Sequence, residues 1–316
     1  MKYIDWQKNE ERFLAMTGYT IEEFYGLLPF FTKAHDEYLR YYTLKGKPRS
    51  GQRTHVIYDN SPLNCHEERL AFILSYNKLN PIQEDHADRF SMTQKQCNEF
   101  VHGLYEVLQR TLKYADVVPA NNNKELAEKL SNEEFAEQKL LLHDGTEREI
   151  PRPIDYELQR ENYSGKKKKH TVKNAVITTA CCTILFVSQT FSGNVHDKSI
   201  ADESYTIPAG YTLMQDTGYQ GYRPEGVTII QPQKKPRGKE LTEEQKESNR
   251  LISSDRVRVE HAIGSVKRYR IVKDECRLRK NNFVDRIFLY CAALHNFRLK
   301  TRPFTYENKL TLVLLH

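Results

Sequence analysis

Three acidic residues in this chain combine residue types and spacings that suit phosphoryl transfer. Asp144 and Asp216 each close a short apolar run with strand character, and a glycine turn signal follows each. Glu260 lies in a stretch with helical spacing, and Arg256 and Lys267 are expected on the same helical face. A carboxylate between two cations suits a site that holds a divalent metal and binds the phosphates around it. We therefore predict a metal-dependent phosphoryl-transfer site made of two strand-end aspartates and a helix-borne glutamate.

The second half of the chain must position these acids, and its pattern predicts a mixed α/β domain over residues 136–316. Short runs rich in Val, Ile, Thr and Phe indicate strands, and those at 171–179 and 184–191 are expected to pair as a hairpin. The other expected strands are 140–143, 213–215 and 227–231, and the expected helices are 197–204, 243–253, 257–271 and 283–299. The apolar C-terminal end, residues 310–316, has no place in this scheme.

A second aspartate competes with Asp216 for a place in the site. Asp197 follows His196, and a His-Asp pair after a strand and a glycine has metal-binding chemistry. Aspartate at this position is equally suited to cap the helix expected to start there, so both interpretations stay open. The lysine run 166–169 either forms a solvated turn or follows a DNA backbone. Lys167 and Lys168 are our candidates for phosphate contacts.

The sequence pattern predicts helices in the first half of the chain. We divide it into an N-terminal helical and linker segment (1–60), a helix-turn-helix DNA-binding domain (61–113) and a linker (114–135). Within the second of these, a helix through 83–90 is followed by a break and a long helix over 94–112, with Thr93 as its N-cap. A helix-turn-helix would present the start of the second helix to DNA. The residues expected to do so are Thr93, Gln94, Lys95, Gln96 and Asn98. A plain helical bundle with a solvated polar face is the alternative.

Charge is spread unevenly and points to the class of partner. The chain of 316 residues carries a net charge of +6. Residues 136–316 carry 31 Lys and Arg against 22 Asp and Glu, whereas residues 1–135 carry 17 against 20. Isolated acids in a basic field favour a polyanionic substrate over a small molecule. No apolar run approaches the roughly 18 residues that span a membrane, and no secretory signal is recognised. The six cysteines lack metal-binding spacing, which favours an intracellular protein with reduced thiols.

With these residues in view, the chain resembles a DDE transposase of the IS5-like insertion-sequence superfamily, related to Harbinger-type transposases. The matching motifs occur in a fixed order, at 143–147, 163–173, 193–197, 216–221, 249–250, 256–267 and 294–296. The resemblance implies an RNase H-like catalytic domain with Asp144, Asp216 and Glu260 as its triad, preceded by an all-α helix-turn-helix domain. One position departs from the pattern, because Ser253 stands where related transposases often carry tyrosine.

The resemblance also implies a mechanism and partners. Two Mg²⁺ ions, which Mn²⁺ can replace, are expected to be bridged by Asp144, with Asp216 and Glu260 completing one site each. Water frees a 3′-OH at the element ends, and this hydroxyl attacks target DNA, while Arg256 and Lys267 hold the flanking phosphates. The expected partners are double-stranded DNA and a second copy of the chain, without membrane or small-molecule substrate. The protein is expected in the bacterial cytoplasm at the nucleoid, or in the nucleus of a eukaryote. The alternatives are a domesticated DNA-binding protein and another RNase H-like metal-dependent nuclease.

Overall fold

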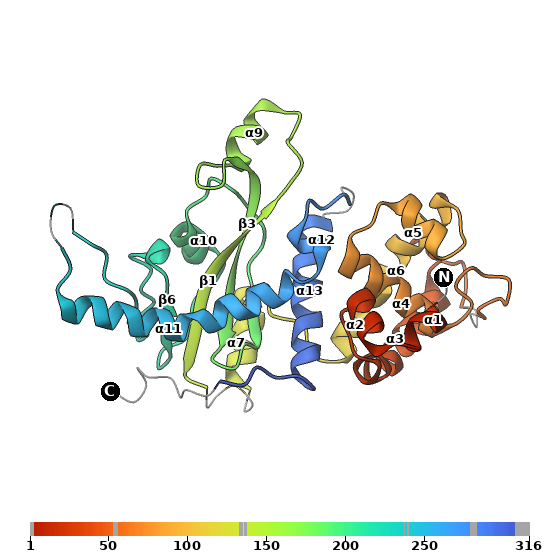
Figure 1. Cartoon of the computed structure of the whole chain (residues 1–316), viewed down its shortest axis with the longest axis horizontal. Coiled ribbons are helices and arrows are strands. Elements are labelled where there is room, and N and C mark those ends of the chain that lie inside the picture. The colour runs from red at the N-terminus through yellow and green to blue at the C-terminus, as the bar shows by residue number, and fades with distance from the viewer. Residues whose placement is uncertain are drawn as a thin grey trace. The chain divides into compact units, whose positions relative to one another are not determined.

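The computed structural model describes residues 3–52, 56–132, 135, 138–236, 238, 240–278 and 283–306. Two compact units make up the chain (Figure 1). The first contains Met1–Val118 and Lys267–Cys276, and the second contains Pro119–Val266 and Arg277–His316. The apolar end at 310–316 and the predicted domain start at residue 136 lie outside the described residues.

Helices form the first unit. They are α1 (Tyr3–Gln7), α2 (Glu10–Thr17), α3 (Ile21–Tyr41), α4 (His66–Leu79), α5 (Gln83–Arg89), α6 (Gln94–Tyr114) and α12 (Arg270–Lys273). Thr93 caps α6 as predicted: its hydroxyl accepts the backbone N–H of Gln96, whose side chain accepts the backbone N–H of Thr93. A short connection joins α5 to α6, so the helical elements of the predicted motif are present. Their binding to DNA stays a prediction.

A mixed sheet forms the centre of the second unit. Its strands are β1 (Leu140–Glu149), β2 (Tyr163–Ser164), β3 (Lys169–Thr179), β4 (Ile184–Val187), β5 (Phe191–Ser192), β6 (Thr212–Gln215) and β7 (Thr228–Ile230). The order is β2-β3-β1-β6-β7, and β4 and β5 also pair with β3. β1 runs antiparallel to β3 and parallel to β6. The predicted mixed α/β class is confirmed, and the arrangement is consistent with a DDE nuclease fold.

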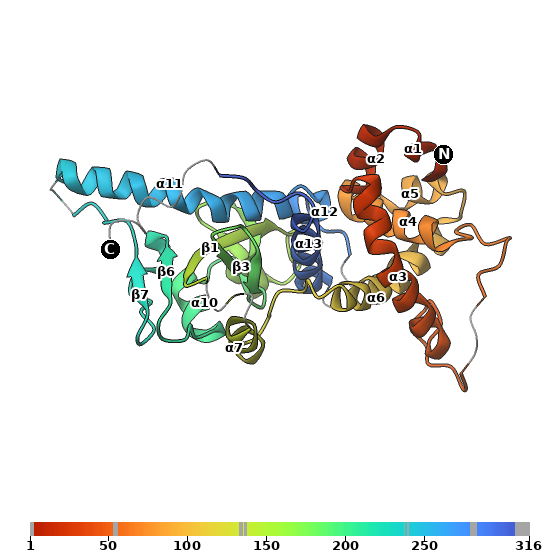
Figure 2. The same ribbon diagram turned by 90° about the horizontal axis from the view of Figure 1, so that it is seen from below.

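Helices cover both faces of this sheet. The helical elements of this unit are α7 (Asn123–Ser131), α9 (Tyr156–Asn162), α10 (Asp197–Ser204), the 3₁₀ turn η1 (Thr217–Tyr219), α11 (Glu243–Val266) and α13 (Phe283–Leu299), of which α9 projects beyond the end of the sheet (Figure 1). Figure 2 shows α11 along one side of the sheet and α7 and α10 on the other. Leu126 and Leu130 of α7 belong to the core on the α10 side, so residues interpreted from sequence as a linker pack into the second unit. No helix in the described part of the chain is both long and apolar enough to cross a membrane.

Two elements differ from the sequence expectation in ways that matter for the site. β1 does not end at Asp144 but continues to Glu149, because residues 145–149 pair with residues 171–175 of β3. The glycine after Asp144 is therefore a strand residue and not a turn. The two predicted helices at 243–253 and 257–271 are one helix that ends at Val266, since no Gly or Pro interrupts residues 254–256.

Candidate active site

Asp144 and Asp216 occupy matching positions on neighbouring parallel strands. His143 of β1 is paired with Gln215 of β6, and each aspartate is the next residue along its chain. Successive side chains of a strand point to opposite faces, so both aspartates lie on the face opposite to that of His143 and Gln215. Their side chains are 21% and 45% exposed, respectively. The parallel pairing thus brings together two acids that are 72 residues apart in the sequence.

Arg256 of α11 bridges the two aspartates. Its Nη2 lies 3.8 Å from Oδ2 of Asp144, and its Nη1 lies 3.5 Å from Oδ1 of Asp216. The guanidinium is buried, and within the described residues its Nε has no hydrogen-bond partner. Both ion pairs are longer than charge-assisted hydrogen bonds of about 2.7–2.9 Å, so neither carboxylate is fully satisfied.

Glu260 follows Arg256 by one helical turn and is exposed on α11. Its charge acts on Asp144, which brings the third acid to the same cluster. Lys267 differs from the expectation, because α11 ends at Val266 and Lys267 belongs to the first unit. Arg256 and Glu260 thus lie on α11, Lys267 is the residue after its end, and the phosphate contact of Lys267 stays a prediction.

The charge of Asp144 is unfavourable where it lies. Burial raises the pKa of its carboxyl from 3.8 to about 6. Arg256 and the backbone N–H of Gly145, which donates to Asp144 Oδ1 at 2.8 Å, lower this pKa, whereas the charges of Asp216 and Glu260 raise it. Desolvation and two neighbouring acids thus outweigh the guanidinium. A half-buried acid with a raised pKa beside other acids is typical of a functional site.

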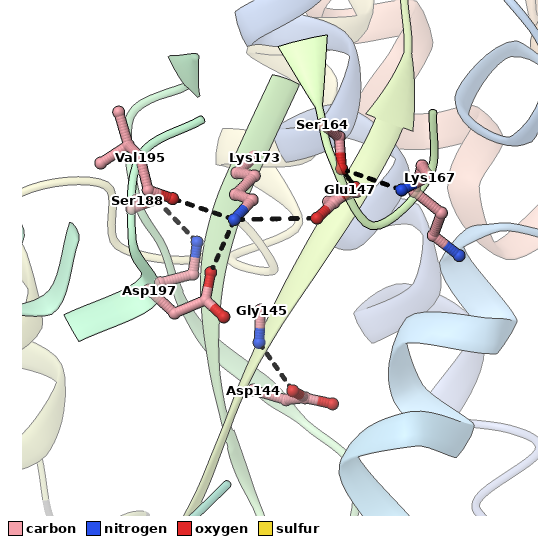
Figure 3. Close-up of polar contacts among 10 residues, drawn as sticks. Asp144, Gly145, Glu147, Ser164, Lys167, Lys173, Ser188, Val195 and Asp197 are labelled. Atoms are coloured by element: carbon pink, nitrogen blue, oxygen red, sulfur yellow. Dashed lines mark hydrogen bonds and ion pairs between the residues drawn. The ribbon is translucent and has the colours of Figure 1, made fainter. Parts of the chain in front are cut away.

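Asp197 lies on the face of β1 opposite to that of Asp144, where it forms an ion pair with Lys173 (Figure 3). Nζ of Lys173 lies 3.3 Å from Asp197, 3.7 Å from Glu147 and 2.9 Å from the carbonyl oxygen of Val195. The helix cap expected of Asp197 is not formed: His196 is the N-cap residue of α10, and Asp197 is its first helical residue. Asp197 therefore holds Lys173 in place, and its acidic side chain also suits the first turn of a helix.

Two glycines allow these layers to approach closely. A Cβ at Gly145 would lie 3.1 Å from Oη of Tyr219 and 3.5 Å from Oδ1 of Asp197. A Cβ at Gly218 would lie 3.0 Å from Oδ2 of Asp197. Gly145 is thus a strand residue with little room for a side chain, whereas Gly218 lies in the turn η1, where the sequence suggested a turn.

The lysine run forms the exposed turn between β2 and β3. Lys166, Lys167 and Lys168 have exposed side chains, and Lys168 adopts a left-handed conformation with φ of 54°. The turn is tied to β1 through Ser164, whose hydroxyl accepts the backbone N–H of Lys167 and donates to Glu147 (Figure 3). The predicted phosphate contacts therefore lie on a fixed turn at the edge of the sheet.

In the first unit, the predicted DNA-reading amides have partners within the protein. Gln94 and Asn98 both donate to the side chain of Gln83, at 2.9 and 3.1 Å. Gln96 is engaged in the capping box of α6. Lys95, at the exposed start of α6, is left as the predicted contact most directly available to phosphate.

Sequence reasoning gave no role to Glu147, Lys173 or Tyr219. All three lie inside the motifs that carry the family resemblance, and this position was the signal that could have identified them. Glu147 and Lys173 are opposite each other in the β1–β3 register, and their side chains are only 16% and 14% exposed. A cross-strand ion pair of this kind could have been found once the two strands were aligned.

Among the described residues, the group of three potential metal ligands whose ligand atoms lie close together is in the first unit, whereas the three acids are in the second. The ligand atoms of His35, Asp36 and His66 in the first unit all lie within 4.8 Å of one another. Arg69, however, donates to Nε2 of His35, so Nδ1 carries the proton and donates to Asp36. His66 contacts the same carboxylate at 3.0 Å. These residues satisfy one another as a hydrogen-bond chain, and His35 has no lone pair left for a metal.

Comparisons with known proteins show which family this part of the chain resembles. Residues 143–296 match the family model described as DDE superfamily endonuclease, a group that generally uses divalent metal ions. A probable transposase for insertion sequence element IS702 from Microchaete diplosiphon is 30% identical over 165 residues. That alignment covers 52% of this chain and 59% of the relative's length. No solved structure matches the chain significantly.

Proposed function

We propose that this protein is an insertion-sequence transposase that cuts and joins DNA, because its residues 143–296 match the family model described as DDE superfamily endonuclease. Asp144, Asp216 and Glu260 are its proposed metal-binding triad, on an RNase H-like domain. The observation that carries the proposal is the pairing of β1 with β6, which sets two aspartates side by side under Arg256.

The chemistry of the cluster fits a divalent cation. Two carboxylates face one guanidinium, the charge of Glu260 acts on the same cluster, and the ion pairs of Arg256 are too long to satisfy Asp144 and Asp216. Hard cations such as Mg²⁺ prefer such oxygen ligands. Two Mg²⁺ ions, or Mn²⁺ in their place, would supply an activated nucleophile and would stabilise charge at the scissile phosphate.

The protein's own groups have separable tasks in this proposal. The carboxylates of Asp144 and Asp216 would hold the cations, and Glu260 would complete the set from α11. With those carboxylates engaged, the planar fork of Arg256 would be available to bind phosphate oxygens beside the scissile bond. Lys167 and Lys168 bind the DNA backbone farther out, and Lys267 is a further proposed phosphate contact. The first unit binds element ends through the start of α6, and a dimer holds two ends together.

The test is metal-dependent nicking and strand transfer on duplexes that carry the DNA flanking the gene. Wild-type protein is compared with Asp216→Asn and Asp197→Asn, and the melting temperature of each variant is measured alongside. We expect Asp216→Asn to abolish cutting and Asp197→Asn to retain it, because only Asp216 lies on the face of Asp144.

If a folded Asp197→Asn variant loses cutting and Asp216→Asn does not, Asp197 and not Asp216 is the second acid of the triad. A wild-type protein that binds the DNA but cuts with neither Mg²⁺ nor Mn²⁺ would contradict the enzyme and favour a DNA-binding descendant. Cleavage of an RNA–DNA hybrid without strand transfer would favour a different nuclease of the same superfamily.

A further inference from the structure

The segment between β1 and β3, residues 150–168, presents an unusual set of apolar side chains, and we call it the arm. Ile154 is fully exposed, and Tyr156, Leu158 and Tyr163 are 69%, 48% and 46% exposed. Among the described residues of the second unit, these four are the exposed large hydrophobic side chains. Such a concentration in ten residues indicates a binding surface, whereas single exposed apolar residues are ordinary.

Hydrogen bonds hold the arm in one conformation. Arg152 donates to Oε1 of Gln159 at 2.8 and 3.1 Å, and Gln159 donates to the carbonyl oxygen of Pro153 at 2.9 Å. Asp155 caps α9 by accepting the N–H of Leu158. The chain enters the arm through a bond from Ile150 N–H to the carbonyl of His170. Ile154 and Tyr156 are thus held in solvent by ordered backbone on both sides.

Positive charge lies beside these apolar side chains. The turn after β2 exposes Lys166, Lys167 and Lys168, and none of their ammonium groups takes part in an ion pair among the described residues. The next lysine is different, because Lys169 pairs with Glu149 at 2.8 Å. The arm therefore ends in three cations available to a polyanion.

The small area and the positive charge of the arm favour DNA as its binding partner. A stable interface between two copies buries about 800 Å² on each partner, more than four side chains supply, and the lysine turns would repel each other. DNA offers phosphates to the lysines and the apolar faces of its bases to the tyrosines. Those faces are accessible only where bases are unpaired or unstacked.

We propose that the arm binds opened bases of DNA with Ile154, Tyr156 and Tyr163, while Lys166, Lys167 and Lys168 bind the adjacent backbone. This inference rests on the proposed function, because it places the opened bases near the cleavage site. Asp144 and Ile150 are six residues apart on an extended strand, which is roughly 20 Å. At about 3.4 Å per base pair, the arm begins some six base pairs from the phosphate at Asp144.

The experiment compares binding of the full chain to two labelled 40-bp duplexes, one intact and one with a three-base unpaired bubble. The probe is fluorescence anisotropy, and a 2-aminopurine in the bubble reports stacking. We expect wild type to bind the bubble at least tenfold more tightly. Tyr156→Ala and Tyr163→Ala should each lose about tenfold on the bubble and little on the intact duplex, since one base–tyrosine stack is removed. Tyr58→Ala is the matched control, because Tyr58 is 71% exposed but lies outside the arm.

Equal affinity of wild type for both duplexes would overturn the proposal, as would an unchanged preference in both tyrosine variants. A change in mass by light scattering in these variants, with unchanged binding to DNA, would assign the arm to contacts between copies. Failure of wild type to cut flanking DNA would count against the proposed function alone, since the bubble assay requires no cleavage.

Discussion

Replacing Asp144 with asparagine is expected to stabilise the metal-free protein above neutral pH. The folded state raises the pKa of this carboxyl from 3.8 to about 6, so between these values the native protein holds a proton that the unfolded chain has lost. The free energy of unfolding then falls as pH rises through this window. A shift of about two units corresponds to roughly 3 kcal/mol, which is lost in full above about pH 7. Asp144→Asn removes the ionisation and with it this loss.

The assay is urea unfolding of wild type and Asp144→Asn from pH 4 to pH 8 in the presence of EDTA. Circular dichroism of the sheet follows the second unit, while fluorescence of Trp6, the only tryptophan, reports the first. We expect the difference in unfolding free energy to rise from near zero at pH 4 to as much as about 3 kcal/mol at pH 8. The tryptophan signal should not change. Asp216→Asn is the matched control and should alter stability by less than about 1 kcal/mol, since its side chain is 45% exposed.

Parallel curves for wild type and Asp144→Asn across this pH range would refute the reasoning, because they would show that Asp144 is well solvated. Adding Mg²⁺ makes a second check. It should restore stability to wild type at pH 8 and leave Asp144→Asn unaffected.

Other consequences of the structure can be measured separately. Protons compete with metal at Asp144, so apparent Mg²⁺ affinity by calorimetry should fall up to tenfold per pH unit below about pH 6; a flat profile from pH 5 to 7 would contradict this. Arg256→Lys keeps the charge but loses the planar fork, and we expect DNA cleavage to fall more than tenfold with little change in melting temperature. Full activity of Arg256→Lys would show that charge alone suffices. Gly193→Ala should destabilise the second unit by about 1–3 kcal/mol, because its Cβ would lie 2.3 Å from Oγ1 of Thr171. Gly165→Ala, with open space around it, is the control and should be near neutral.

Local sequence signals predicted the elements with clear boundaries. Thr93 starts α6 through the capping box, and the limits expected for the helices at 197–204 and 283–299 are those observed. The strand that carries Asp144 was predicted too short, because residues 145–149 are polar and include glycine. Their strand conformation depends on pairing with β3, a long-range contact that local propensity does not report.

The site was predicted in part for the same reason. The three acids could be selected by type and motif, but the bridging position of Arg256 depends on how α11 packs on β1 and β6. A phosphate contact was expected of Arg256, and the structure shows it paired with two carboxylates. The partnership of Lys173 with Asp197 was equally hidden, since it joins a strand to the start of a helix 24 residues later.

The two faces of β1 explain why the chain keeps so many acids close together without equivalent roles. On the α10 face, Asp197 and Glu147 share the ammonium of Lys173, which also bonds to a backbone carbonyl. On the α11 face, Asp144 and Asp216 share the single guanidinium of Arg256 at 3.8 and 3.5 Å, and the charges of Asp216 and Glu260 raise the pKa of Asp144. A partly desolvated carboxylate such as Asp144, with other acids beside it, costs stability unless a further cation binds. The α11 face is therefore our proposed place for a divalent ion, with Asp216 as the proposed second acid, whereas Asp197 holds Lys173 on the opposite face of β1.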